Sequence, residues 1–191
     1  MLKKKKSLNV RTVALMIFAL VLISNSASAV QVFGPTQISA STSIPSSGAG
    51  FTIDQICDGI IDPAVWFNGF AAAPGMVGTI RLDLATASDL HDFVLWNDIN
   101  VLAEGIADFR LDFFDSADIS LGSTEVFTGP LGSQAPVVYA FEQVNNVKRV
   151  DLVVLSLNIN NRLEIREVGF NNEEIVASEG TSWSQLKSLY R

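Results

Sequence analysis

Apolar and polar residues alternate along residues 79–115, and this alternation constrains the fold more than any other feature of the sequence. Ile80, Leu82 and Leu84 are separated by polar residues, and the same spacing returns within 105–115. Successive side chains of a β-strand point to opposite faces, so a period of two buries one set and leaves the other in water. The stretch therefore predicts three strands of a sheet with one buried face.

Apolar runs bounded by turn residues continue this pattern on both sides of the central stretch. Polar loops are expected at 85–90 and 97–104, and a polar turn at 115–122. Residues 51–56 suit either a short strand or a helical turn. The remaining predicted strands lie at 37–41, 124–127, 137–141, 147–157 and 163–170.

A helix over residues 89–114 is the alternative to the central strands, because Leu, Asp, Ala and Glu all tolerate helices. Gly105 and the period-two pattern favour strands. Short strands separated by turns, without a long amphipathic helix, are typical of a β-sandwich or barrel. We therefore predict an all-β domain.

Several segments in a fixed order resemble the discoidin-type family, also called F5/8 type C or galactose-binding-like domains. The resemblance covers roughly residues 36–170. It implies an eight-stranded antiparallel jelly-roll β-sandwich that binds ligands through loops at one end. The matching segments are Asp58-Gly59 with Trp66, Leu82-Asp83-Leu84, Asp89-Leu90 with Phe93 and Leu95-Trp96-Asn97, Gly105 to Asp115, Arg149 to Leu152, and Ile165 to Phe170.

The N-terminus has the three parts of a secretory signal peptide. Lys3 to Lys6 and Arg11 make a positive region, Val13 to Ile23 an apolar run, and Ala27-Ser28-Ala29 a small-residue cleavage site. The apolar run is shorter than the ~20 residues of a membrane span. We expect cleavage before Val30, a mature chain without a membrane span, and an extracellular or periplasmic protein.

The domain organisation follows from these limits. Residues 1–29 are the predicted signal peptide, and 30–170 the discoidin-like sandwich. Residues 171–191 read as a polar linker and a short amphipathic tail, in which Trp183 and Leu186 share one helical face.

The charge of the chain excludes some classes of partner. The predicted signal holds five of the 13 Lys and Arg residues and none of the 20 Asp and Glu residues, which leaves a mature net charge of −12. Nucleic acids and anionic lipids need basic patches, so neither is expected as a partner. A sugar, a calcium ion or a basic protein suits such a chain.

The sequence carries no strong catalytic motif. His91, its one histidine, stands at the start of a predicted strand, and no Gly-x-Ser-x-Gly motif accompanies it. A structural role is favoured for this histidine. Cys57 lies in an apolar run and is expected to be a buried thiol. No catalytic residue is assigned.

The resemblance also implies a structural calcium ion. Many members of the family hold Ca²⁺ beside the Asp-Gly loop with its aspartate, nearby loop oxygens and the glutamate of the closing strand. Those positions match Asp58 and Glu167 here. Ile60 and Ala64 depart from the family pattern, which often has Asn and a hydroxyl residue there, and Asp62 is the candidate substitute. Without calcium, Asp58 would begin a turn and Glu167 would be a surface strand residue.

Aromatic rings and polar side chains in two loops suggest a ligand surface. Phe67 and Phe70 lie in a long loop rich in Gly and Pro, and Trp96, Asn97 and Asp98 end a central strand. Aromatic faces pack against the apolar faces of sugars, and amides and carboxylates bind their hydroxyls. These five residues are the predicted ligand contacts. For the two loop rings, packing within the protein is about as well supported as ligand contact, and for Trp96 it is favoured. Trp66 is expected in the core.

The sequence therefore predicts a secreted, non-catalytic module that recognises a carbohydrate or another extracellular ligand. The alternative is a structural or adhesive extracellular protein whose sandwich binds another protein. A small secreted hydrolase is a third hypothesis, because the abundant carboxylates include many pairs.

Overall fold

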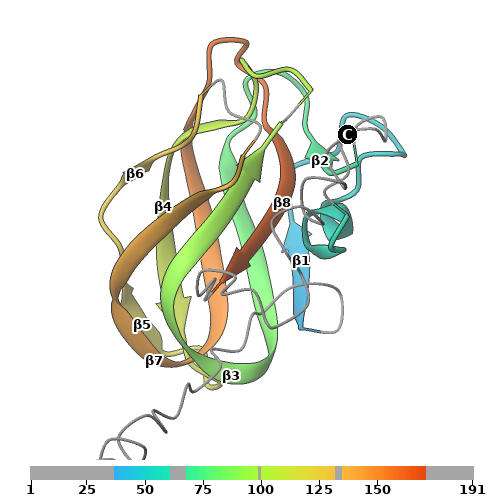
Figure 1. Ribbon diagram of the computed structural model, residues 1–191. Helices are drawn as coiled ribbons and strands as arrows, with labels where there is room; N and C mark the ends of the chain where they lie inside the picture. The colour runs from blue at the N-terminus through green and yellow to red at the C-terminus, as the bar shows by residue number, and fades with distance from the viewer. Residues whose placement is uncertain (1–36, 61–67, 99, 132–134, 171–191) are drawn as a thin grey trace, which may run out of the picture.

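Eight antiparallel β-strands and one 3-10 helix build the protein, in a computed structural model that describes residues 37–60, 68–98, 100–131 and 135–170 (Figure 1). This confirms the predicted all-β class. The predicted signal peptide and the tail lie outside the described residues. The elements are β1 (Ile38–Thr42), η1 (Ile53–Cys57), β2 (Phe70–Ala71), β3 (Gly78–Asn97), β4 (Ile106–Phe114), β5 (Ser120–Ser123), β6 (Phe127–Thr128), β7 (Val137–Leu157) and β8 (Glu164–Phe170).

The strands form two facing layers, and β3 and β7 are long enough to take part in both. The first half of β3 pairs with β1 and with the second half of β7. The second half of β7 pairs in turn with β4, and β4 pairs with β5 and β6. The second half of β3 pairs with the first half of β7 and with β8, which pairs with β2. Phe93 of β3 and Phe109 of β4 meet between the layers, with ring centroids 5.6 Å apart.

The predicted loop at 85–90 is wrong, because β3 runs through it as one strand of 20 residues. Between Asp83 and Asp92 the pairing with β7 shifts register three times. Such irregularities bend a strand without ending it, so β3 passes from one layer to the other while its polar residues stay in water. β7 likewise joins the two strands predicted at 137–141 and 147–157.

The predicted turn at 115–122 and strand at 124–127 are also corrected. The side chain of Asp115 accepts hydrogen bonds from the backbone nitrogens of Ala117 and Ile119, which closes a shorter turn and lets β5 begin at Ser120. The hydroxyl of Thr124 accepts a hydrogen bond from Leu111 N. Thr124 N still donates to Leu111 O at 2.9 Å, but the hydroxyl takes the place of a backbone acceptor, and the strand pairing is interrupted before β6.

Residues 51–56, predicted as a strand or a helical turn, overlap the helix η1, which extends one residue further to Cys57. Gln55 Oε1 accepts a hydrogen bond from Thr52 N at 3.1 Å, which caps its first turn. The alternative helix over 89–114 is wrong. Among the described residues, no helix is long and apolar enough to cross a membrane.

The core forms as the alternation predicts. Ile80 and Leu82 of β3 and Leu111 of β4 are completely buried, whereas Arg81 between the first two is exposed. Cys57 is a buried free thiol, as expected, and burial raises its pKa to about 11. The core thus extends between the two layers and under η1.

Candidate functional site

The closing strand β8 is buried over its whole length, although it carries Glu164, Arg166 and Glu167. Burying a charged side chain is costly unless partners satisfy it. The Arg166 guanidinium donates to Asn68 O at 3.0 Å. The two glutamates lead to two separate polar sites.

Glu167 meets the Asp-Gly loop, as the resemblance implies. Gly59 N donates to Glu167 Oε1 at 3.3 Å. The neighbouring Asp58 carboxylate accepts two contacts from Asn68 Nδ2, at 3.0 and 3.3 Å, and one from Ile60 N at 2.8 Å. The structure therefore brings together the two predicted metal residues from distant parts of the chain, while Asp62 lies outside the described residues.

The electrostatics of Glu167 fit a cation. Burial raises the pKa of its carboxyl to about 8, the Gly59 N–H lowers it, and the charge of Asp58 raises it. Glu167 Oε2 is buried and has no hydrogen-bond partner among the described residues. A proton or a hard cation would satisfy this oxygen, and carboxylate oxygens are the ligands that Ca²⁺ prefers.

The two predicted ligand rings that the structure describes, Phe70 and Trp96, are buried. Phe70 belongs to β2, pairs with Ile165 of β8, and is only 1% exposed. Its prediction as an exposed loop ring is wrong, because β2 adds it to the sheet and turns it into the core. Trp96 pairs with Glu167 and is 7% exposed, which agrees with the alternative that its ring packs within the protein. Phe67 lies outside the described residues.

Asn97 is a clamp between loops and not an open ligand group. It is 3% exposed, and its Nδ2 donates to Ile106 O at 2.9 Å and to Pro130 O at 3.0 Å. Its Oδ1 accepts from Ile106 N at 3.0 Å. Gly105 has a φ of +101°, and a Cβ there would lie 2.5 Å from Asn97 Cγ. The predicted ligand role for Asn97 is therefore corrected.

Asp98 is likewise turned inward. It is 2% exposed, and its two carboxylate oxygens accept from Asn100 N at 2.8 Å and Val101 N at 2.9 Å. These bonds hold the turn that follows β3. The prediction of Asp98 as an exposed acceptor for a sugar is wrong, because its oxygens are used by its own loop.

Asp98 also belongs to a buried acidic cluster that the sequence did not predict. Carboxylate oxygens of Asp98, Glu104 and Glu164 lie within 4.8 Å of one another. Burial, the charge of Glu104 and the hydrogen bond with Asp98 raise the pKa of Glu164 to about 8, while Arg162, at 3.0 Å from Glu164 Oε1, lowers it. This arrangement lets Glu164 keep its proton near neutral pH.

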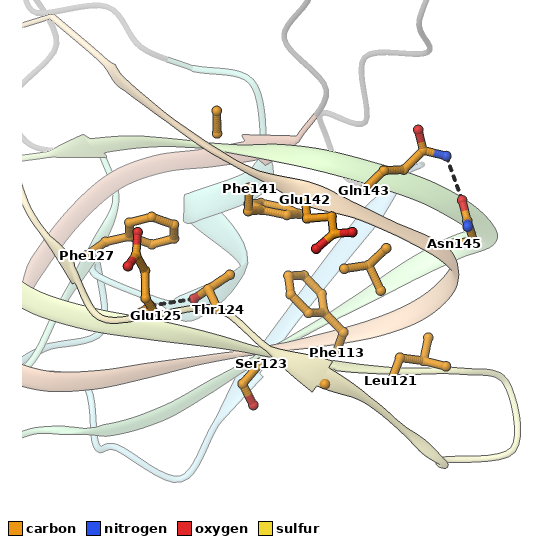
Figure 2. Close-up of a pocket in the computed structure, with 13 residues that line it drawn as sticks. Phe113, Leu121, Ser123, Thr124, Glu125, Phe127, Phe141, Glu142, Gln143 and Asn145 are labelled. Carbon is orange, nitrogen blue, oxygen red and sulfur yellow. Dashed lines mark hydrogen bonds between the residues drawn. The ribbon is translucent and has the colours of Figure 1, made fainter.

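An open groove of about 590 Å³ lies elsewhere, on the side of the sandwich where β5, β6 and the first half of β7 face each other (Figure 2). Its apolar surface consists of Phe113, Leu121, Phe127, Phe141 and Val144. The rings of Phe113 and Phe141 join the two walls, with centroids 5.1 Å apart. The sequence did not predict this groove.

Polar side chains surround this apolar surface. They come from the β5–β6 segment on one wall and from β7 on the other, as Figure 2 shows. Among the described residues, no strand pairs with this part of β7 on its groove side. A ligand in the groove can therefore contact backbone groups of β7 as well as its side chains. The polar side chains are Ser123, Thr124, Glu125, Glu142, Gln143 and Asn145.

Several solved structures share this architecture. The family 32 carbohydrate-binding module of Clostridium perfringens NanJ, solved in complex with galactose, matches with a TM-score of 0.57 and 9% identity over 74% of this chain and 98% of that module. Chitosan-binding module 1 of a chitosanase/glucanase from Paenibacillus sp. IK-5 matches with a TM-score of 0.55 and 16% identity over 74% and 98%. The F5/8 type C domain of a Bacteroides fragilis protein matches with a TM-score of 0.53 and 15% identity over 70% and 89%.

No protein-family model matches the chain, and no curated protein matches it by sequence. At these low identities the structural likeness concerns the fold. It agrees with the strand pairing described above and with the segments that resemble the discoidin-type family. The protein has the galactose-binding-like jelly-roll fold of F5/8 type C domains and family 32 carbohydrate-binding modules.

Proposed function

We propose that the protein is a secreted, non-catalytic module that binds a carbohydrate in the groove between β7 and the β5–β6 segment. The observation that carries this proposal is the combination of an apolar aromatic surface with surrounding carboxylates and amides in one open groove. Its volume lies within the ~300–1,000 Å³ typical of small-molecule sites.

The chemistry of the groove suits a pyranose ring. The partly exposed rings of Phe127 and Phe141 can cover the C–H face of a sugar. The amides of Gln143 and Asn145 both donate and accept, and sugar hydroxyls need both functions. Modules of the same fold from Clostridium perfringens were solved with galactose and with GalNAc-β-1,3-galactose, which supports this class of ligand.

A glycan array on the mature protein tests the proposal, followed by titration of the best ligand. Gln143 Nε2 donates to Asn145 Oδ1 at 2.6 Å, so replacing both by Ala removes the pair without leaving a lone partner. The double variant should fold normally and bind at least tenfold more weakly. Thr86→Ala, in the exposed bend of β3, is the control and should bind as the wild type does. Absence of binding to every glycan would contradict the proposal.

We also infer that a calcium ion binds beside the Asp-Gly loop. Asp58 and Glu167 would supply carboxylate oxygens, and Glu167 Oε2 is the buried oxygen that needs such a partner. Bound there, the ion would link the loop to the closing strand and neutralise two acids. Asp58 and Glu167 would hold these two segments together, which suits a structural role away from the groove.

A protein ligand is the second candidate. Exposed aliphatic side chains stand on three loops that meet near the Asn97 clamp: Val101, Leu131 and Ile159, the last 78% exposed. Such side chains suit a protein surface better than a sugar. Cross-linking of an extracellular protein that is lost in Ile159→Ser, with glycan binding absent, would favour this function.

A further inference from the structure

The groove carries negative charge that no described residue along its walls neutralises. Its lining contains two carboxylates, Glu125 and Glu142, and no Lys, Arg or His. Both side chains are exposed, and they come from opposite walls (Figure 2). A ligand in the groove therefore meets acidic groups from two sides.

The basic residues that follow in β7 are bound elsewhere. Lys148 Nζ donates to the backbone oxygens of Leu84 and Ala85, at 2.5 and 2.7 Å. Arg149 pairs with Asp118 and Asp151. Their charges hold β7 to its own sheet and to the turn before β5, so the two groove carboxylates gain no cation from them.

The groove carboxylates also differ from most acids of the sandwich in lacking partners. Among the described residues, no donor makes a hydrogen bond to the side chain of Glu125 or Glu142. By contrast, Asp98, Asp108 and Asp112 each accept hydrogen bonds from the protein. The oxygens of Glu125 and Glu142 therefore remain available to a ligand, beside rings and amides that suit a sugar.

We propose that the groove selects amino sugars with free amines, such as glucosamine oligomers, over neutral and acidic glycans. This inference rests on the proposed function. A protonated amine donates three hydrogen bonds and attracts the carboxylates, whereas an N-acetyl group does neither. A uronic or sialic acid is repelled by the same oxygens. Two exposed charge contacts are expected to change affinity by about tenfold.

The test is calorimetric titration with a glucosamine hexamer and with its fully N-acetylated counterpart, at a pH where the amines are protonated. The wild type should bind the free-amine hexamer about tenfold more tightly. Glu125→Gln/Glu142→Gln should bind the two hexamers equally and melt at the wild-type temperature. Asp54→Asn removes an exposed acid on η1, away from the groove, and should keep the preference. Added salt should weaken the preference, because it screens exposed charges.

Each other result overturns the inference in a distinct way. Equal affinity of the wild type for both hexamers would refute amine selection and leave carbohydrate binding in place. A preference that survives in the double Gln variant would place amine recognition outside the groove. If no glycan of the array and neither hexamer binds, while poly-lysine does, both the inference and the proposed function fail and the groove binds basic peptides.

Discussion

The loop end of the sandwich and the groove beside β7 contain similar residue types, but their side chains serve different purposes. At the loop end, Asn97 and Asp98 are buried and their polar atoms bind backbone groups. In the groove, Glu125 and Glu142 are exposed and make no side-chain hydrogen bond to the described part of the chain. The availability of a polar atom, and not its residue type, therefore decides whether a position can bind a ligand.

The largest expected effect concerns Phe70. Phe70→Ala should destabilise the domain by about 3–5 kcal/mol, because it leaves a cavity between β2 and the core. Val126→Ala, at an exposed apolar position, should change stability by less than ~0.5 kcal/mol. Urea unfolding followed by fluorescence measures both. A Phe70→Ala protein of wild-type stability that has lost its ligand would restore Phe70 as a contact residue.

Asn97→Ala should have the next largest effect, on the order of 3 kcal/mol. It removes three hydrogen bonds, two of them buried, and takes from the backbone groups of Ile106 their side-chain partner, while Pro130 O keeps its bond from Asn158 Nδ2. The melting temperature should fall by about 10 °C. If glycan binding disappears while the melting temperature stays unchanged, Asn97 is a ligand residue and the contrast between the two regions is broken.

Calcium should stabilise the domain through the Asp-Gly loop. A ligand that binds only the folded state at 100 times its dissociation constant adds about 2.7 kcal/mol, so the melting temperature should rise on addition of Ca²⁺ and fall with a chelator. Asp58→Ala should abolish the rise, and Asp54→Ala, four residues earlier on η1, should keep it. Identical melting curves of the wild type with Ca²⁺ and with chelator would rule out the site.

The acidic cluster predicts how stability depends on pH in chelator. The pKa of Glu164 is raised from 4.5 to about 8 in the folded state. The proton on Glu164 contributes to the free energy of unfolding, and this contribution is fully present below pH 4.5. It is lost as pH rises toward 8, by up to ~1.4 kcal/mol per pH unit, because only the unfolded state releases the proton in this range. Because the pKa of Glu167 is raised in the same way, Glu164→Gln should reduce this dependence without abolishing it, and Glu142→Gln should leave it unchanged. An unchanged slope in Glu164→Gln would show that the cluster does not hold the proton.

The sequence predicted the parts of the fold that depend on local pattern. Alternation identified the buried face that Ile80, Leu82 and Leu111 share, and the closing strand was found within a residue of its bounds. The continuous bend in β3 was missed, because polar residues in an irregular strand resemble those of a loop.

The functional sites, like the fold, were predicted only in part. Asp58 and Glu167 were paired through the resemblance to a known family, although 108 residues separate Gly59 from Glu167. The groove was missed because its lining comes from β4, from the β5–β6 segment and from β7, and the sequence pattern does not show that Phe113 and Phe141 of different strands meet. Asn97 and Asp98 were misplaced because sequence cannot tell whether an amide or carboxylate at a strand end faces solvent or its own backbone.

NMR mapping of the bound sugar distinguishes the groove from the loop end. Backbone amide shifts of the ¹⁵N-labelled mature protein should be followed while the best glycan of the array is titrated. The groove assignment predicts that the largest changes fall on residues 121–127 and 140–145, on the two walls of the groove, and that 97–105 change little. Changes concentrated in 97–105, with the groove unaffected, would contradict it and return the ligand to the loop end.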